Sequence, residues 1–296
     1  MAMRFIAFKK AILYLSYFLG SKRINVMSVE ETLKYLNKRE ISICRYGDGE
    51  MDIINGKSIG FQKFDKELAD RLDEILCSKP EKCAIAIPES VAMKFQNLTD
   101  DSYKFWISNQ FWNRKRWVQK LSNDYIYCNA HISRMYIRYA DKTNCSKNFN
   151  LLKKLWEKED VLVVEGAETR LGVGNDLLSG ASSIQRLLAP TTDSYQCYHT
   201  ILEKVKIYGK GKTIILALGP TATVLAWDLA QQGYRALDLG HCDVEYEWFL
   251  RNSQSKAPLD YKYVNETNEK ITRQTDMPKK IYETYTSQIV GKIKVE

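Results

Sequence analysis

Three largely apolar segments in the second half of the chain constrain its fold more than any other feature. They are DVLVVEG, KTIILALGP and YRALDLGH, and they end in glycine or a carboxylate. Helical segments are predicted at about 176–189, 195–207 and 221–232. Strands that are apolar throughout and alternate with helices indicate a parallel sheet covered on both faces. The sequence therefore predicts an α/β, Rossmann-like fold with a mostly parallel sheet.

The first half of the chain shows the same alternation of helix and strand. Ser28, with Glu31 three residues later, has the pattern of a capping box and predicts a helix that leads into a strand at 41–45. The segment FDKELADRLDEIL predicts a helix with one apolar face, and CAIAIP predicts a buried strand. In such sheets ligands bind beyond the carboxyl ends of the strands. Those ends carry Asp48, Glu50, Glu165, Gly219, Thr221, His241 and Asp243.

The composition excludes several classes of protein. With 45% hydrophobic and 27% charged residues, the 296-residue chain is neither disordered nor collagen-like, and its length suits one main domain. The net charge of +8 favours anionic ligands, and phosphate-bearing small molecules are expected rather than nucleic acid because no arginine-rich tract is present. The seven cysteines include no C-x-x-C pair, which argues against a zinc ribbon and fits a reducing cytoplasm.

The first 23 residues combine apolar and basic side chains. Their uninterrupted apolar run, from Ala11 to Gly20, is shorter than the ~20 residues that cross a bilayer. A short helix flanked by lysine and arginine suits peripheral contact with an anionic membrane, and it equally suits packing against the rest of the domain. Residues 1–23 are therefore expected either to bind a membrane surface or to form a first packed helix.

Asp48-Gly49-Glu50 follows the strand at 41–45 and is the sharpest local signal. In a turn or extended segment, residues i and i+2 project the same way, and Gly49 lets the backbone bend so that both carboxylates reach one point. Mg2+ or Mn2+ relieves the repulsion between two such carboxylates, while substrate phosphates and water fill the remaining positions. The alternative is an acidic turn that needs glycine only for its backbone conformation.

The turn Gly219-Pro220-Thr221 joins an apolar strand to a helix. A helix N-terminus offers free N–H groups and the positive end of a dipole, which suits a phosphate. An ordinary strand-to-helix turn is the alternative. Two other segments, GKGKT and GVGNDLLSG, are not phosphate loops, because each lacks a glycine that its motif requires.

Two further clusters are candidates for the site. His241, Asp243, Glu245 and Glu247 would share one side of an extended segment, where they suit a general base, a second metal position or recognition of sugar hydroxyls. A solvated edge is the alternative. In the helix predicted within 101–121, Trp106, Trp112 and Trp117 suit either a sugar-stacking wall or ordinary packing.

Four separated motifs, taken in order, resemble the GT-D fold glycosyltransferases, formerly described as a bacterial domain of unknown function. The motifs are CRYGDGE, VEGAETRLGVGNDL, LALGPTATVLAWDLAQQGYRALDLGHCDVEYEWF and KYVNE. The likeness covers about Ser28 to Glu266, and all four motifs are intact. It implies a GT-D type glycosyltransferase domain at 28–270, preceded by a basic amphipathic helix at 1–27 and followed by a C-terminal extension at 271–296.

The resemblance implies a metal-dependent transferase that moves a sugar, expected to be glucose, from a UDP-sugar to a glycan acceptor. Its D-x-E motif corresponds to Asp48 and Glu50, which would hold Mn2+ or Mg2+ against the donor diphosphate. The base that takes the acceptor proton is expected among His241, Asp243 and Glu245. Residues expected to bind the nucleotide sugar are Arg45, Gly47, Glu165, Arg170, Asn175, Asp176, Gly219 and Thr221.

The acceptor is expected on a surface polysaccharide, a lipid-linked glycan or a glycoprotein, and the expected location is the cytoplasm, at the inner face of the membrane if residues 1–23 bind it. Two other classes fit the same motifs. A metal-dependent phosphohydrolase would use the same carboxylates but would need no acceptor. A non-catalytic module would bind the UDP-sugar or glycan without turnover.

Overall fold

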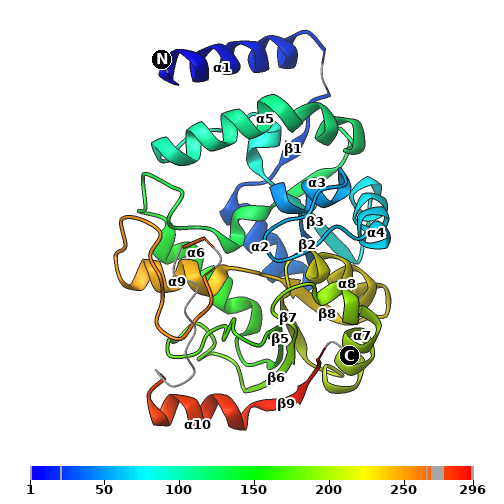
Figure 1. Cartoon of the computed structure of the whole chain (residues 1–296), viewed down its shortest axis with the longest axis vertical. Coiled ribbons are helices and arrows are strands. Elements are labelled where there is room, and N and C mark those ends of the chain that lie inside the picture. The colour runs from blue at the N-terminus through cyan, green and yellow to red at the C-terminus, as the bar shows by residue number, and fades with distance from the viewer. Residues whose placement is uncertain (1, 21, 265, 268–276, 295–296) are drawn as a thin grey trace.

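The computed structural model describes residues 2–20, 22–264, 266–267 and 277–294, which form an α/β fold around one sheet (Figure 1). The described strands are β1 (Asn25–Val26), β2 (Ser42–Arg45), β3 (Cys83–Ile87), β4 (Ile126–Asn129), β5 (Asp160–Gly166), β6 (Ser183–Ala189), β7 (Thr213–Ala217), β8 (Arg235–Asp238) and β9 (Ile289–Lys292). Their order is β1-β4-β3-β2-β8-β7-β5-β6-β9, and each neighbouring pair is parallel. The predicted parallel sheet is confirmed.

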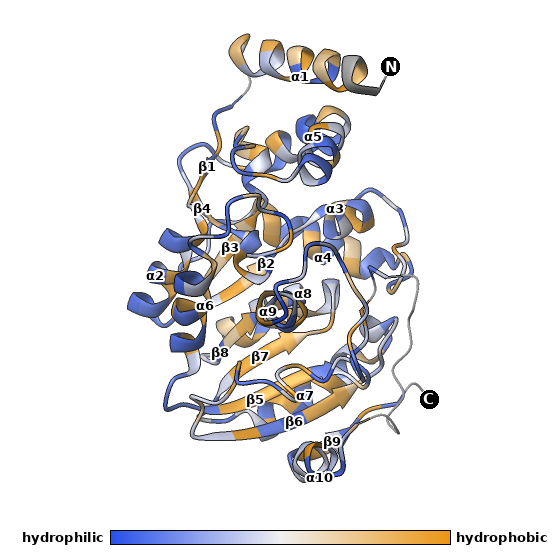
Figure 2. Ribbon diagram, turned by 90° about the vertical axis from the view of Figure 1, so that its left-hand side faces the viewer, coloured by the Kyte–Doolittle hydropathy of each residue, from blue (hydrophilic) through white to orange (hydrophobic). Residues whose placement is uncertain are grey.

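Helices cover both faces of the sheet. The described helices are α1 (Ala2–Phe18), α2 (Val29–Arg39), α3 (Asp48–Ile54), α4 (Lys66–Cys77), α5 (Asp100–Lys120), α6 (Cys145–Lys153), α7 (Tyr198–Tyr208), α8 (Pro220–Gln231), α9 (Cys242–Leu250) and α10 (Lys279–Ser287). In β5, Val161 and Val163 pack in the layer of α2, α6 and α9, whereas Leu162 and Val164 pack in the layer of α4, α7 and α8. Figure 2 shows these apolar strands between the two helical layers.

Short-range signals set the start of α2 and the inward face of α4 as predicted. Ser28 Oγ accepts a hydrogen bond from the N–H of Glu31 at 3.2 Å, and the Glu31 carboxylate accepts one from the N–H of Ser28 at 2.8 Å. This reciprocal pair satisfies two backbone donors that the start of a helix leaves unpaired. Along α4, Leu68, Leu72 and Leu76 are fully buried, so the apolar stripe faces the core.

The helix predicted at about 176–189 is wrong, because Ser183–Ala189 form β6. Strand β6 pairs with β5 along its whole length, and its Arg186 is buried with Nη1 2.7 Å from Oε1 of Glu165 in β5. A buried ion pair interrupts the apolar run that identifies a strand, which explains the error. Strand β9 pairs with β6 in turn, so part of the expected C-terminal extension belongs to the sheet. Residues 271–276 and 295–296 of that extension lie outside the described residues.

The strand order reverses between β2 and β8, which are neighbours in the sheet but distant in the sequence. From β2 the chain proceeds through β3 and β4 to one edge, whereas β8, β7 and β5 lie toward the other. Only Ile43 and Leu237 are paired across this junction. A reversal of this kind leaves a crevice beyond the carboxyl ends of the strands, and ligands of α/β proteins bind there.

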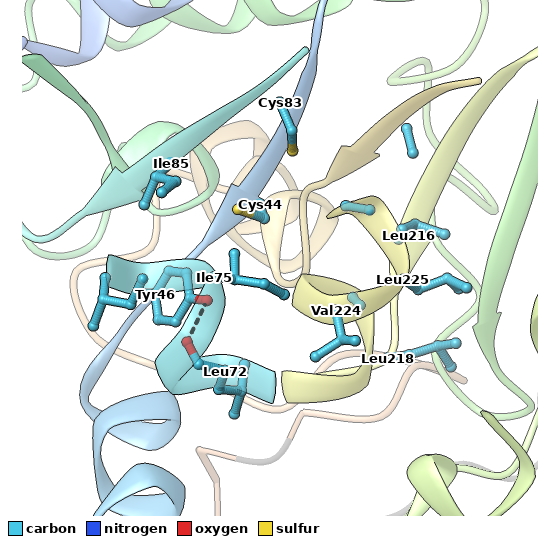
Figure 3. Packing of buried hydrophobic residues seen from close by; sticks show 14 of the residues in the cluster. Cys44, Tyr46, Leu72, Ile75, Cys83, Ile85, Leu216, Leu218, Val224 and Leu225 are labelled. Carbon is cyan, nitrogen blue, oxygen red and sulfur yellow. Dashed lines mark hydrogen bonds between the residues drawn. The ribbon is translucent and has the colours of Figure 1, made fainter. Parts of the chain in front are cut away.

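Apolar packing anchors the end of β2 at this junction. Cys44 of β2 lies in the layer with Ile75 of α4 and Leu225 of α8, as Figure 3 shows. The next inward side chain is Tyr46, which is fully buried and donates its hydroxyl hydrogen to the carbonyl of Leu72 at 2.9 Å (Figure 3). Tyr46 thus ties the chain just before Gly47 to α4.

Helix α1 lies at one end of the long axis of the molecule, against α5 (Figure 1). Leu13 is buried with Trp106 and Ile107 of α5, so the predicted packing against the domain is present. A second face carries large apolar side chains that are exposed, namely Phe5, Phe8, Ile12 and Leu15, with Leu19 just after the helix. Helix α1 is therefore apolar on two faces, unlike the expected amphipathic helix with one apolar face. No helix among the described residues is long and apolar enough to cross a membrane.

Candidate active site

A cavity of about 940 Å³ opens beyond the carboxyl ends of the strands, at the reversal point of the sheet. Segments that follow β2, β7 and β8 form one part of its wall, and the start of α5 with the segment after β4 forms another. The predicted site residues that line it are Arg45, Gly47, Asp48, Glu50, Gly219, His241, Asp243 and Glu245. The strand-end rule therefore located the cavity from the sequence.

Asp48 and Glu50 lie in the first turn of α3, and the expected turn or extended segment is wrong at this point. Residues two apart on a helix do not face the same way, so the helix by itself does not direct the two carboxylates at one point, although both residues line the cavity. Glu50 Oε2 accepts a hydrogen bond from the N–H of Gly47 at 2.7 Å, as in a capping box. Asp48 is exposed and lines the cavity.

The charge of Glu50 is poorly compensated. Burial raises the pKa of Glu50 to about 7 even though the Gly47 N–H opposes this, and the Asp238 carboxylate raises the pKa further. Among the described residues Glu50 forms no ion pair, so a cation at this position would stabilise its ionised form.

The residues present fit a divalent cation held partly by substrate. Within the part of the chain that the structure describes, no three or more His, Cys, Asp or Glu side chains are grouped to hold a metal ion. Mg2+ and similar cations are commonly bound through one or two carboxylates, with phosphates and water completing the coordination. Asp48 and Glu50 supply such a pair of carboxylates at the cavity wall.

Arg45 is held by the protein itself rather than directed at a ligand. Its Nε donates to the Asp238 carbonyl at 2.7 Å, and its Nη2 lies 3.1 Å from the Asp238 carboxylate. A Cβ on Gly240 would collide with the same guanidinium, so only glycine fits there. Arg45 therefore braces β2 against β8 at their narrow junction, and it does not have the free guanidinium expected for a diphosphate ligand.

The turn at the start of α8 contributes backbone rather than side chains to the cavity. Gly219 has a φ of 56° and lines the cavity, and an added Cβ would lie 2.5 Å from the ring of Phe61. Both observations require glycine at this position. Thr221 is fully buried and does not line the cavity, so its predicted contact with a ligand does not match its position.

The acidic residues after β8 lie on helix α9, and the extended segment predicted there is wrong. Asp243 and Glu247, four residues apart, share one side of the helix and accept hydrogen bonds from the same ammonium group of Lys262, at 2.7 and 3.0 Å. Asn175 also donates to both carboxylates, at 2.7 Å each. Both oxygens of Asp243 are therefore occupied.

Glu245 has the better geometry for a base. Its Oε2 accepts hydrogen bonds from the backbone N–H groups of Tyr136 and Ile137 at 2.8 and 2.9 Å. Its Oε1 is buried and has no hydrogen-bond partner among the described residues. Burial raises the pKa of Glu245, although Arg134 opposes the shift. His241, just before α9, lines the same cavity.

Besides Thr221, four more predicted site residues do not line the cavity. Glu165 pairs with Arg186 inside the sheet, and Arg170 donates to the carbonyl of Tyr261. Asn175 holds Asp243 in place, as described above. Asp176 accepts hydrogen bonds from Lys153 and Tyr246, both at 2.6 Å. The expectation that Asn175 and Asp176 read the nucleoside does not match these positions.

Of the three tryptophans that the sequence offered as a sugar-stacking wall, Trp106 of α5 lines the cavity, whereas Trp112 and Trp117 do not. Sequence reasoning missed the other part of this wall, the segment after β4, which includes the short 3-10 helix η2 (Ala130–Ser133). Residues of this wall are Phe105, Trp106, His131, Arg134 and Arg138. Applying the strand-end rule to the predicted strand DYIYC would have pointed to His131. No sequence pattern predicted the two arginines.

Comparison with known proteins decides the family. A family model described as the glycosyltransferase GT-D fold matches residues 43–267, most of the chain. The chain belongs to the GT-D glycosyltransferase family. The matched region contains the D-x-E motif and every strand from β3 to β8, so GT-D membership accounts for the cavity and the sheet together.

Two curated relatives in this GT-D comparison are streptococcal. "Probable glycosyl transferase Gly" of Streptococcus gordonii is 37% identical over 282 residues, which are 93% of this chain and 40% of that protein. "Glycosyltransferase GlyD" of Streptococcus pneumoniae serotype 4 is 35% identical over 271 residues, 91% of this chain and 33% of that protein. The chain therefore spans less than half the length of either relative.

Solved GT-D structures share the whole fold. One, described as "The highly conserved domain of unknown function 1792 has a distinct glycosyltransferase fold", is 36% identical with a TM-score of 0.86, covering 92% of this chain and 97% of that chain. Another, "A New Glycosyltransferase (DUF1792) from Streptococcus sanguinis", is 36% identical with a TM-score of 0.85 over 92% of this chain and all of that chain (100%).

Proposed function

We propose that this chain is a metal-dependent glycosyltransferase that moves a sugar, expected to be glucose, from a UDP-sugar to a glycan acceptor. The observation that carries the proposal is the D-x-E pair at a cavity of about 940 Å³ on the reversal point of a GT-D sheet. Asp48 and Glu50 supply carboxylates for Mn2+ or Mg2+, and the start of α8, which meets the cavity at Gly219, supplies backbone N–H groups for a phosphate. When bound, the cation neutralises charge that builds up on the departing UDP.

For an inverting transfer, the groups of this chain support one route for the acceptor proton. The acceptor hydroxyl oxygen bonds to the anomeric carbon of the sugar as the bond to UDP breaks, and the hydroxyl proton passes to Oε1 of Glu245. Two backbone N–H groups fix the orientation of that carboxylate through Oε2, and its raised pKa suits proton acceptance. Asp243, bound by Lys262 and Asn175, positions the start of α9 instead.

Calorimetric titration of UDP and UDP-glucose, with and without Mn2+, tests the donor site. Wild-type protein should bind UDP in a Mn2+-dependent manner, and Asp48→Asn should lose that dependence while its circular dichroism is unchanged. Asp70→Asn is the matched control, because Asp70 is an exposed carboxylate on α4 that pairs only with Lys66 among the described residues. Equal Mn2+-dependent binding in wild type and Asp48→Asn would overturn the assignment of Asp48.

Product analysis separates transfer from the two other classes. A phosphohydrolase would release free sugar or phosphate from UDP-glucose at a rate that does not depend on an added glycan. A non-catalytic module would bind UDP without turnover of any acceptor. The proposal requires a product in which the sugar is joined to the acceptor.

We also propose that the exposed face of α1 binds an anionic membrane, which places the protein at the inner face of the cytoplasmic membrane. Phe5, Phe8, Ile12, Leu15 and Leu19 recur at intervals of three and four residues along that face. Lys22 and Arg23 are exposed just after α1, and α1 contains no acidic residue, so the positive charge at this end of α1 complements anionic lipid.

Sedimentation with vesicles tests this contact. The double change Phe8→Ser/Leu15→Ser should abolish binding to anionic vesicles, and zwitterionic vesicles should bind the wild type weakly. Ile207→Ser is the control, because Ile207 is a similarly exposed apolar side chain on α7 (66% exposed). Undiminished binding of the double variant, or self-association of the wild type through α1 in place of vesicle binding, would contradict the proposal.

A further inference from the structure

Arg138 is the guanidinium of the cavity wall that lacks a carboxylate partner among the described residues. Arg45 pairs with Asp238, and Arg134 pairs with Glu266. Nε and Nη1 of Arg138 are buried and make no hydrogen bond to any described residue. The Arg138 side chain is partly buried, and Glu245 and Glu89 attract its charge without pairing with it, so this attraction offsets only part of the desolvation cost. We therefore expect a bound ligand to supply the missing hydrogen-bond partners of Arg138.

Two more partnerless polar atoms lie beside Arg138. The guanidinium carbon sits 5.2 Å from the ring centre of Trp106, and the His131 ring packs against the same indole at 5.5 Å. Trp106 Nε1 and His131 Nε2 are buried without a hydrogen-bond partner among the described residues. Both side chains are 3% exposed and both line the cavity. Three neighbouring side chains at one part of the wall therefore carry buried polar atoms that have no hydrogen-bond partner among the described residues.

The chemistry of these atoms selects the ligand. Arg138 and Trp106 offer only N–H donors, so the missing partners are acceptors, and a guanidinium fork matches a carboxylate or a phosphate. The charged and titratable groups that act on Arg138 are Arg134, Glu245, Glu89 and Tyr139. Arg134, close enough to disfavour the charge of Arg138, would be offset by a bound oxyanion.

The position of this wall favours the acceptor rather than the donor. Asp48, Glu50 and Gly219 lie at the ends of β2 and β7, whereas Arg138 follows β4, on the far side of β3 from β2. Phe105 lies on the same wall and is 47% exposed, which gives a sugar ring an aromatic face to cover. This wall therefore offers Arg138 to an oxyanion and Phe105 to a sugar ring, on the other side of β3 from the D-x-E pair.

We propose that Arg138, Trp106 and His131 form an acceptor subsite that binds an oxyanion carried by a sugar. The oxyanion is the carboxylate of a uronic acid or the phosphate of a sugar phosphate, which share the same recognition chemistry. This inference rests on the proposed transferase function, because the subsite is assigned to the acceptor of that reaction.

Binding of glucuronate, glucose 6-phosphate and glucose, measured by calorimetry with and without saturating UDP and Mn2+, tests the subsite. Wild-type protein should bind at least one anionic probe about tenfold or more tightly than glucose, since a charge-assisted bidentate contact has about this effect. Arg138→Gln should lose that preference and keep its affinity for UDP. Arg138→Lys keeps the positive charge but cannot form two parallel hydrogen bonds, so its preference for the anionic probe should lie between those of wild type and Arg138→Gln. Arg116→Gln, an exposed arginine on the same helix as Trp106, should behave as wild type.

Each outcome has a separate meaning. The anionic probe that binds identifies the source of the oxyanion. Equal binding of glucose and both anionic probes would overturn the proposal, and so would an Arg138→Gln variant that loses UDP affinity but keeps the anion preference. If the wild type failed to bind UDP while the Arg138-dependent preference persisted, the donor assignment would be wrong and the subsite assignment would still hold.

The folding of the variants is checked by their melting temperatures. Arg138→Gln should melt at or above the wild-type temperature, because the change removes a charge that has no ion-pair partner among the described residues. Arg138→Lys provides a second folded variant.

Discussion

Buried charges in this chain divide into those that the fold compensates and those that it does not. Glu165 with Arg186, and Asp243 with Lys262, are paired away from water. Glu50 and Arg138 lie on the cavity wall and form no ion pair with another described residue. Paired charges fix the structure around the site, whereas uncompensated charges gain most from a ligand. The sequence placed Glu50, Glu165 and Asp243 alike at strand ends, and it does not show which of these carboxylates the fold pairs with a cation.

The pair Glu165–Arg186 provides a direct test of this division. Arg186→Met should lower the free energy of unfolding by about 3 kcal/mol or more, because Glu165 would remain buried without its cation. The double change Arg186→Met/Glu165→Leu should recover most of that loss. Urea unfolding followed by circular dichroism measures both. A double variant as unstable as the single one would show that the pair contributes through packing alone.

His131 and Glu89 predict the acid sensitivity of the fold. Burial, reinforced by Arg138, lowers the pKa of His131 to about 4 from the usual 6.5. Between these pH values the unfolded chain binds a proton that the folded chain does not, so stability falls as pH drops from 6.5 to 4. Burial alone would raise the pKa of Glu89, but hydrogen bonds from His131, Tyr139 and Asn129 lower it to about 2, so further stability is lost below pH 4.5.

Melting temperatures measured from pH 7 to pH 4 test this dependence. His131→Gln should flatten the profile above pH 4.5, because glutamine does not titrate. His199→Gln is the control, since His199 is exposed on α7. An unchanged slope in His131→Gln would assign the acid sensitivity to other groups.

At the scale of single elements, whether the sequence predicts a helix or a strand correctly depends on how much of that element is apolar. The sequence predicts strands β5 and β7 correctly because both are largely apolar runs, and nearly every residue in them is buried. Helices α3 and α9 were predicted as extended, because their short acidic starts lack an apolar stripe in the sequence. Strand β6 was predicted as helix because Arg186 interrupts its apolar run. The errors at α3 and α9 fall on the site, where residue choice serves a ligand as well as the core.

The capping box of α2 gives an element-scale prediction. Ser28→Ala should lower the free energy of unfolding by about 1 kcal/mol, because the N–H of Glu31 loses its acceptor. Ser146→Ala, at an exposed position within α6, should cause no such loss. Chemical unfolding of the two variants measures the difference. Equal stability of both would mean that water replaces the Ser28 hydroxyl at no cost.

For the whole molecule, the sheet extends further than the sequence motifs do. Strand β9 covers the edge of β6, and Met277 and Tyr285 form a small buried cluster with Val173 and Leu188. The expected domain boundary near residue 270 therefore cuts through packed structure. Motif reasoning could not place this boundary, because β9 is short and half-buried and carries no apolar run.

Removal of residues 277–296 tests the boundary. The truncated chain should melt at a lower temperature and bind more of a hydrophobic dye, because the edge of β6 and the cluster around Leu188 would be exposed to water. Light scattering should show association through the uncovered edge. A truncated chain that is monomeric and as stable as the full one would show that residues up to 276 form a complete domain.

The single paired position between β2 and β8 has a mechanical consequence. Asp48 and Glu50 belong to one half of the sheet and Glu245 to the other, and Ile43–Leu237 is the register pair that joins the halves. The span from the D-x-E motif to Glu245 therefore depends on Arg45, Asp238 and α8, which bridge the junction, more than on the backbone ladder. Asp238 and α8 do not line the cavity, so substitutions there would change the distance between the D-x-E motif and Glu245 without removing a side chain from the cavity wall.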